Sequence, residues 1–246
     1  MITFEDKVFE QSILEDRCHI AVPFEVIAET DGGVILLVYS FCEKIAEEFE
    51  ARFSAFPFSA EAKAFLYEKL TPVMNEIEYE CVGACERVHY TYKMTDAAAL
   101  NPPCFRGRAE RLDKLTKKDI AESETELSEF SIDPADELDR IFVIRGDHGE
   151  VAAFAAVNDI SDDEGFYELT VECAPTYRGR GYGSECVAEL SKYLLDRGVS
   201  VEYICAEENL PSVRTAEKVG FTLVKKCMPF VCYHIGKEDE DKDIAF

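Results

Sequence analysis

Residues 178–184 read Arg178-Gly179-Arg180-Gly181-Tyr182-Gly183-Ser184, between a strand-like run that ends at Cys173 and a helical pattern that extends to Arg197. Glycines allow a backbone to approach a ligand closely. The first turn of a helix carries a partial positive charge, and two arginines add full charges. The stretch therefore predicts an anion-binding loop between a strand and a helix, with a pyrophosphate as its ligand.

Two other phosphate-binding motifs do not fit this stretch. A P-loop needs a Gly-Lys-Ser/Thr ending, which is absent here. The dinucleotide fingerprint needs glycines spaced G-x-G-x-x-G between parallel strands, whereas residues 179–183 read G-x-G-x-G and residues 141–173 predict an antiparallel meander.

A second block further along the chain reads Asn209-Leu210-Pro211-Ser212-Val213-Arg214-Thr215-Ala216-Glu217-Lys218-Val219-Gly220-Phe221. Together with Arg178-x-x-Gly181-x-Gly183, it resembles the GNAT superfamily of N-acetyltransferases. The loop is similar to that family's acyl-CoA pyrophosphate loop, and the second block to its segment of asparagine, capped helix and terminal Gly-Phe. The resemblance covers residues 105–235 and says little about the first hundred residues.

The predicted fold is α/β of the α+β kind, with a mixed, mainly antiparallel sheet and helices on both faces. The strongest break is Asn101-Pro102-Pro103, because each proline restricts its own backbone and the residue before it. We therefore expect a smaller α+β domain over residues 1–100, a GNAT-like domain over 105–236 and an acidic tail over 237–246. Within the first domain we expect a helix near Phe4 to Leu14 and a hairpin turn at Asp31-Gly32-Gly33.

The resemblance implies transfer of an acetyl group from acetyl-CoA to a primary amine by direct attack. It implies that backbone N–H groups of the loop hold the pyrophosphate, that Val171 and Cys173 line the pantetheine arm, and that Asn209 binds the cofactor near that arm. The loop residues so assigned are Arg178, Gly179, Arg180, Gly181, Tyr182, Gly183 and Ser184. For Ser212 we favour a helix cap alone.

A primary amine has a pKa near 10, so the reaction needs a base. Glu168 and Glu172 lie on the strand before the loop, and Glu168 is the better candidate, although Tyr167 occupies the place where relatives often carry a glutamate. Ala216 stands where many relatives carry a tyrosine, the proton donor to the departing thiolate. Tyr203, Tyr233 or solvent remain as donors.

Composition limits the possible partners of the chain. The 246 residues carry a formal net charge of -24, which makes binding to a nucleic acid backbone repulsive. No run approaches the roughly 18 to 20 apolar residues of a membrane span, and the start lacks a secretion signal, so we expect a cytoplasmic protein without membrane contact. The 10 cysteines are expected as free thiols, and their spacing predicts no metal site.

Residues 122–139 contain eight acids and no base. They favour a cationic acceptor such as a polyamine, an aminoglycoside or a lysine-rich peptide, and an ordinary solvated face is the other interpretation. We favour a small-molecule amine as acceptor. Two alternatives stay open: a peptide or protein N-acetyltransferase, and a non-catalytic acyl-CoA-binding sensor.

Residues 1–100 have three candidate roles: shaping the acceptor site, forming a diverged second acetyltransferase-like lobe, or mediating a homodimer. They contain no R-x-x-G-x-G, so we expect one cofactor per chain.

Overall fold

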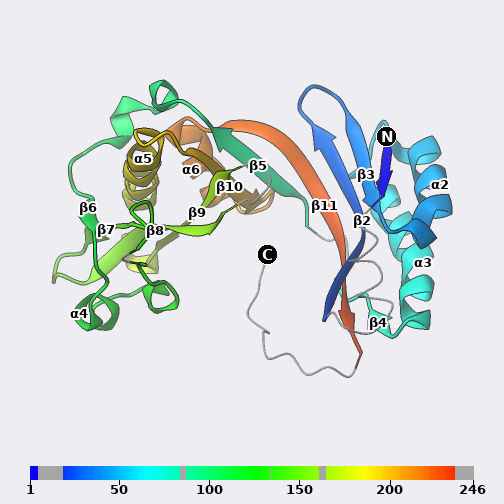
Figure 1. Cartoon of the computed structure of the whole chain (residues 1–246), viewed down its shortest axis with the longest axis horizontal. Coiled ribbons are helices and arrows are strands. Elements are labelled where there is room, and N and C mark those ends of the chain that lie inside the picture. Colours follow the sequence, from blue (N-terminus) through cyan, green and yellow to red (C-terminus); the bar gives the residue numbers. More distant parts are fainter. Residues whose placement is uncertain (5–18, 84–86, 134, 161–164, 236–246) are drawn as a thin grey trace. The chain divides into compact units, whose positions relative to one another are not determined.

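The computed structural model describes residues 1–4, 19–83, 87–133, 135–160 and 165–235 (Figure 1). The chain divides into two compact units: unit 1 is Met1–Tyr90 with Lys225–Phe246, and unit 2 is Thr91–Val224. The strands β5 (His89–Met94) and β11 (Thr222–His234) each contribute residues to both units. The Asn101-Pro102-Pro103 break therefore lies inside unit 2. The expected tail at 237–246 lies outside the described residues, as does the expected helix near 4–14, apart from Phe4.

The described part of unit 1 contains a sheet and the helices α2 and α3. Its strands run in the order β1-β3-β2-β11, with the short β4 also paired to β11. Its elements are β1 (Ile2–Phe4), β2 (Ile20–Glu29), β3 (Val34–Val38), α2 (Glu43–Phe53), α3 (Ala60–Glu76) and β4 (Tyr79–Glu80). The turn at Asp31-Gly32-Gly33 is confirmed: β2 and β3 pair antiparallel, and Gly32 has φ 99, a left-handed conformation that favours glycine.

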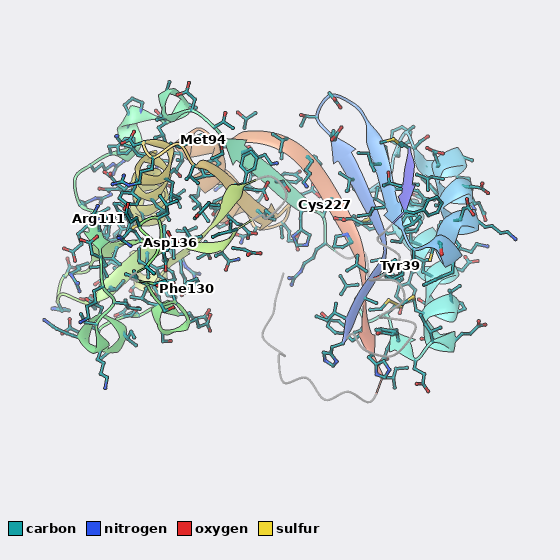
Figure 2. All side chains as sticks on the ribbon, viewed as in Figure 1. Tyr39, Met94, Arg111, Phe130, Asp136 and Cys227 are labelled. Carbon is teal, nitrogen blue, oxygen red and sulfur yellow. A yellow bond between two sulfur atoms is a disulfide. The ribbon has the colours of Figure 1, made fainter. Side chains whose placement is uncertain are left out.

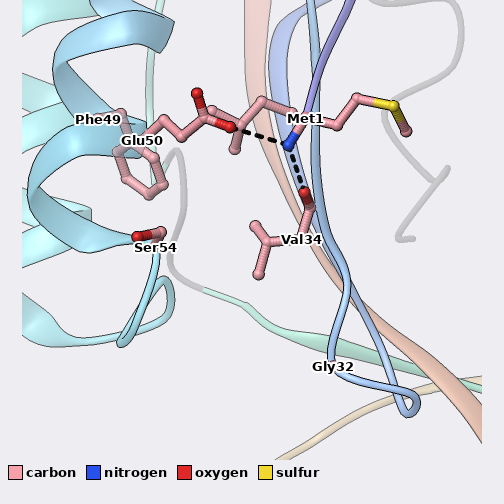
Figure 3. A pocket seen from close by; sticks show the side chains of 7 residues that line it. Met1, Gly32, Val34, Phe49, Glu50 and Ser54 are labelled. Atoms are coloured by element: carbon pink, nitrogen blue, oxygen red, sulfur yellow. Dashed lines mark hydrogen bonds and ion pairs between the residues drawn. The ribbon is translucent and has the colours of Figure 1, made fainter.

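One face of this sheet packs against α2 and α3 (Figure 1). Phe24 of β2 and Phe49 of α2 meet edge to face, with ring centroids 5.6 Å apart, and both are fully buried. A pocket of about 240 Å³ lies between β1, β3 and α2 (Figure 3). There the Met1 amine donates to the Val34 carbonyl (2.7 Å) and forms an ion pair with Glu50 (2.9 Å), which fixes β1 beside β3.

A disulfide joins Cys81 and Cys232. It corrects the expectation of free thiols for these two residues. The antiparallel register of β4 and β11 pairs Glu80 with Tyr233, which sets the next residues, Cys81 and Cys232, opposite each other. Because 151 residues separate the two cysteines in sequence, only the tertiary fold brings them together.

Unit 2 contains a second run of strands in the order β5-β10-β9-β8-β7-β6. The strands β6 to β9 pair antiparallel in succession, whereas β9 and β10 pair in parallel. This mixed, mainly antiparallel sheet flanked by helices confirms the predicted fold class. The strand bounds are β6 (Glu110–Leu112), β7 (Ile141–Arg145), β8 (Val151–Ile160), β9 (Phe166–Cys173) and β10 (Ser200–Ala206).

Three helices complete unit 2: α4 (Lys117–Ala121), α5 (Tyr182–Leu195) and α6 (Leu210–Val219). The α5 helix lies on β7, β8 and β9, and its Val187, Leu190 and Leu194 are fully buried, as their helical spacing predicts. The residue types predict that Thr116 caps a helix starting near Lys117, and the structure confirms this, because the side chains of Thr116 and Asp119 form a capping box at the start of α4.

The sequence pattern predicts helices that start at Ser184 and, after a cap at Ser212, at Val213, and both starts need correction. The α5 helix begins at Tyr182, two residues before Ser184, because Gly181 itself is the N-cap. The α6 helix begins at Leu210, and its N-cap is Asn209, whose side chain accepts a hydrogen bond from the Ser212 N–H (3.3 Å). Pro211 suits this first turn, since a proline there removes an N–H that has no partner within the helix.

Candidate functional site

The glycine loop connects β9 to α5 in unit 2. A short 3-10 turn, Pro175–Tyr177, follows the strand, and Gly179 and Gly181 adopt left-handed φ angles of 78 and 79. Gly181 is the N-cap of α5 and has no side chain to bind the first N–H groups of the helix. These donors therefore remain available to an anion in front of the helix.

Gly183 allows α5 to pack closely on β9. A Cβ at this position would lie 3.2 Å from Cγ2 of Val171. The same contact places Val171 next to the first turn of α5, and Cys173 lies at the end of the same strand. The structure thus brings the predicted loop residues and the two predicted strand residues, Val171 and Cys173, into one place.

Aromatic and cationic side chains support the loop. The rings of Tyr177 and Tyr182 stack at 5.9 Å, with the Arg180 guanidinium over Tyr177 (4.9 Å) and the Arg108 guanidinium over Tyr182 (4.6 Å). Arg178 donates from Nε to the Cys173 carbonyl (3.1 Å). Among the described residues, neither Arg178 nor Arg180 forms an ion pair with a carboxylate, so both charges remain available to an anionic ligand.

Next to the loop, β9 and β10 separate. They pair at three positions only, the last of which joins Glu168 to Glu202. Beyond that pair β9 continues to Cys173 and β10 to Ala206 without pairing to each other. The backbone of residues 169–173 therefore presents unpaired polar groups toward β10, and such an edge can hydrogen-bond an extended ligand.

Glu168 lies where the two strands begin to separate. Its carboxylate accepts a hydrogen bond from Nδ2 of Asn158 (3.2 Å), which is located at the irregularity in the pairing of β8 with β9. Burial raises the pKa of Glu168, and the nearby charges of Glu202 and Asp159 raise it further, against the effect of the Asn158 hydrogen bond. A carboxyl group whose pKa is raised in this way is a candidate for general-base chemistry.

The other two predicted catalytic residues have structural partners. Glu172 accepts a hydrogen bond from the Glu126 N–H (2.8 Å) and so attaches the acidic segment 122–139 to β9. Tyr203 is 2% exposed, its hydroxyl lies 2.8 Å from Oγ of Ser212, and burial raises its pKa far above the ordinary value. Ala216, at the place of the family's tyrosine, is fully buried.

Asn209 lies at the start of α6, where its side-chain oxygen caps the helix. Its amide nitrogen has no other bond among the described hydrogen bonds, so that group is the part of Asn209 that a ligand could use. Ser212 is not the expected cap, because its hydroxyl pairs with Tyr203 instead. Sequence reasoning missed this pair, since the two residues belong to a strand and to the helix after it.

A cavity of about 650 Å³ is lined in part by Tyr167, the residue before Glu168. Phe130 and Asp136, labelled in Figure 2, both line it. Among the described residues, five carboxylates and no basic side chain line this acidic cavity: Glu129, Asp133, Asp136, Asp139 and Asp159. Asn158 also lines it and bonds Glu168, so the cavity and the candidate base share one side chain.

Tyr167 also lines the acidic cavity, and its pKa is raised by burial and by the charges of Asp136 and Asp139. The segment that forms the cavity is anchored in the core: Leu127 is fully buried, and Phe130 packs against Phe154 with ring centroids 5.3 Å apart. Sequence reasoning identified the acids of this segment. It did not identify Asn158, Asp159 or Tyr167 as residues that line a cavity, because a strand pattern does not indicate a cavity.

Acetyl-CoA fits the geometry of this loop. Gly181 leaves the first turn uncapped, Gly183 removes the side chain that would separate α5 from β9, and the open edge of β9 begins beside them. No group of three or more potential metal ligands occurs among the described residues. No described helix is long and apolar enough to cross a bilayer.

The family model for the acetyltransferase (GNAT) family matches residues 104–221. Residues 104–221 therefore form a GNAT acetyltransferase domain, in agreement with the resemblance of the two motif blocks. No curated protein matches the sequence.

Three solved structures similar to the chain are a GCN5-related N-acetyltransferase from Kribbella flavida, a GCN5-related N-acetyltransferase-like protein from Streptococcus suis and an acetyltransferase from the GNAT family from Colwellia psychrerythraea. Their sequence identities are 19%, 22% and 15%, with TM-scores of 0.47, 0.41 and 0.42. The matches cover 68%, 58% and 61% of this chain and 64%, 61% and 56% of theirs. The chain thus spans less than two thirds of the length of each.

Proposed function

We propose that unit 2 transfers an acetyl group from acetyl-CoA to the primary amine of a small, cationic molecule. One arrangement carries this proposal. Glu168 and the open edge of β9 lie on one strand, and the loop 178–184 connects the end of that strand to α5. In this arrangement the loop holds the pyrophosphate of the donor, and residues 169–173 line its pantetheine arm. The thioester then lies where β9 and β10 separate, next to Glu168.

The reaction forms a bond between the amine nitrogen and the acetyl carbon and breaks the carbon–sulfur bond of the thioester. Glu168 accepts the proton that the ammonium must lose, directly or through a water held by Asn158. A backbone N–H on the open edge of β9 polarises the thioester carbonyl. The nitrogen loses its second proton to solvent as the amide forms, and the departing CoA thiolate takes up one proton from solvent; no dedicated acid is needed, because a thiol of pKa about 8 to 9 is a tolerable leaving group.

The acceptor's charge is inferred from the acidic cavity. Five carboxylates and no basic side chain among the described lining residues favour a substrate that carries at least one cationic group besides the reacting amine. The cavity volume of about 650 Å³ is within the range of small-molecule sites. A linear polyamine or an aminoglycoside has this chemistry, and a lysine-rich peptide shares only its charge.

A thiol-release assay tests the proposal. CoA production from acetyl-CoA is followed with a panel of diamines, polyamines, aminoglycosides, uncharged monoamines and peptides with free N-termini. We expect turnover with multiply charged small amines and little with uncharged monoamines. Acetylation confined to peptides would contradict the small-molecule acceptor.

The competing function is a sensor that binds acyl-CoA and catalyses nothing. It is favoured by one specific observation, the absence of a tyrosine at Ala216 together with the burial of Tyr203 against Ser212. Binding of acetyl-CoA without CoA release across the whole panel would support the sensor and overturn the transferase.

A further inference from the structure

Two cations outside the glycine loop converge on Gly181. A Cβ built on Gly181 would lie 3.3 Å from Nζ of Lys218 and 4.0 Å from a terminal nitrogen of Arg106. Lys218 belongs to the last turn of α6, and Arg106 follows the 3-10 turn at Pro102–Cys104. Two segments distant in sequence thus bring positive charge to the N-cap of α5.

Hydrogen bonds fix both segments in this position. The C-terminal carbonyls of α6 are capped by residues 101–104: Asn101 donates to Lys218 O (3.0 Å) and Val219 O (2.9 Å), and the Cys104 thiol donates to Lys218 O (3.4 Å). Gly220 permits this approach, since a Cβ there would lie 2.1 Å from the Ala99 carbonyl oxygen. The backbone that carries Arg106 is therefore attached to the backbone that carries Lys218.

Neither charge has an acidic partner in the part of the chain that the structure describes. Among the described residues, Lys218 and Arg106 form no ion pair with a carboxylate, although the chain carries 50 acids and only 26 bases. Arg108, two residues beyond Arg106, shows the contrast: its guanidinium is bound to the fully buried Glu185, with Nε 2.7 Å and a terminal nitrogen 2.6 Å from Oε2. Arg108 is thus bound to a carboxylate within the protein, whereas Lys218 and Arg106 remain available to a ligand.

We propose that Lys218 and Arg106 bind a phosphate group of CoA and extend the anion site beyond the loop 178–184. This inference rests on the proposed function, because it assigns more of the same donor-binding site. Both side chains are exposed at their ends and attached at their backbones, which suits groups that meet a phosphate at the surface. The bound phosphate belongs to the diphosphate bridge or to the 3′-phosphate of CoA.

Direct binding measurements with CoA and dephospho-CoA test the proposal, using Lys218→Met and Arg106→Met. Methionine keeps an apolar stem and removes the charge. We expect each substitution to weaken CoA binding about tenfold at low salt, and the loss to shrink as salt is raised. An equal loss for both ligands assigns the diphosphate, and a loss for CoA alone assigns the 3′-phosphate.

Three controls make the outcome decisive. Lys114→Met removes an exposed charge in the same unit, away from residues 178–184, and should leave the dissociation constant unchanged. Lys218→Arg should restore most of the affinity, since it restores the charge. Unliganded melting curves of all variants should coincide, because the replaced side chains form no ion pair with any described residue.

The possible failures are distinguishable. If the wild-type chain binds CoA and both methionine variants bind it within twofold, the assignment of Lys218 and Arg106 is overturned and the proposed function stands. If the wild-type chain binds neither CoA nor dephospho-CoA at millimolar concentration, the donor site itself is absent and both proposals are overturned.

Discussion

Glu168 is the residue whose chemistry depends most on its neighbours. Burial, Glu202 and Asp159 all raise its pKa, so it is protonated over a wider pH range than an ordinary carboxyl group. A base must be deprotonated to act. We therefore expect the acid limb of the pH profile of kcat/KM to lie above the ordinary range of a glutamate. Glu168→Gln should lower kcat about a hundredfold, which steady-state assays at saturating acceptor would measure.

Glu202→Gln tests the electrostatic part of this account. Removing a like charge opposite Glu168 favours the ionised form of Glu168 and therefore lowers its pKa. The acid limb of kcat/KM should shift to lower pH in a pH-rate series, and a shift to higher pH would contradict Glu168 as the base.

Tyr203 allows a test of the proton donor. Its hydroxyl is buried and bound to Ser212, so we expect Tyr203→Phe to change kcat less than threefold. The same substitution should lower the free energy of unfolding by about 1 kcal/mol, since it removes a buried hydrogen bond. Rate assays and denaturant unfolding measure the two effects. A loss of kcat of a hundredfold or more at unchanged stability would instead assign Tyr203 as the donor.

Among the elements, the left-handed N-cap of α5 affects both the stability of the helix and the binding of the donor. Gly181 and Gly198 both have φ 79, so alanine at either position should cost about 1 to 2 kcal/mol of backbone strain. Only Gly181→Ala also directs a Cβ at Lys218, whereas a Cβ at Gly198 meets nothing within 4 Å. Melting temperatures should therefore fall alike, and acetyl-CoA binding should weaken in Gly181→Ala alone. Equal binding of acetyl-CoA by both variants would show that the loop is not part of the donor site.

The acidic segment gives a second prediction at this scale. Glu129 and Asp136 line the cavity, so Glu129→Gln with Asp136→Asn should raise KM for a cationic acceptor several-fold and leave kcat nearly unchanged. The asparagine retains the oxygen that accepts from the Leu138 N–H. Glu137→Gln removes one charge from the same segment outside the cavity lining and is the matched control. Steady-state rates at two salt concentrations measure the effect, and equal KM values in all variants would contradict a cationic acceptor.

Elements that follow from local chemistry could be predicted from the sequence. The antiparallel strands, the Thr116 cap and the loop 178–184 depend on residues a few positions apart, and the structure has all three. The start of α6 was missed because Asn209 and Ser212 are both good caps, and the choice depends on the contact of Ser212 with Tyr203. Three other features join residues that are far apart in sequence: the disulfide, the acidic cavity, and the approach of Lys218 and Arg106 to Gly181. A local sequence pattern cannot show which distant residues come into contact.

At the scale of the whole molecule, the Cys81–Cys232 disulfide closes a loop of 151 residues between β4 and β11. A cross-link over so long a loop restricts the unfolded chain and should stabilise the native state by roughly 2 to 5 kcal/mol. Reductant should therefore lower the melting temperature of the wild-type chain. The double variant Cys81→Ser with Cys232→Ser should melt at the lower temperature with or without reductant. An equal effect of reductant on both chains would show that other cysteines are responsible.

The number of acetyl-CoA molecules bound per chain is a property of the whole molecule. With a net charge of -24, most of the surface repels CoA, and Arg106, Arg178, Arg180 and Lys218 gather compensating charge at one helix end in unit 2. Residues 1–100 carry no R-x-x-G-x-G. Calorimetric titration with acetyl-CoA should therefore saturate at one equivalent per chain. At 100 times the dissociation constant, the native state should gain about 2.7 kcal/mol, seen as a higher melting temperature. Two equivalents at saturation would indicate a second donor site and contradict one cofactor site per chain, in unit 2.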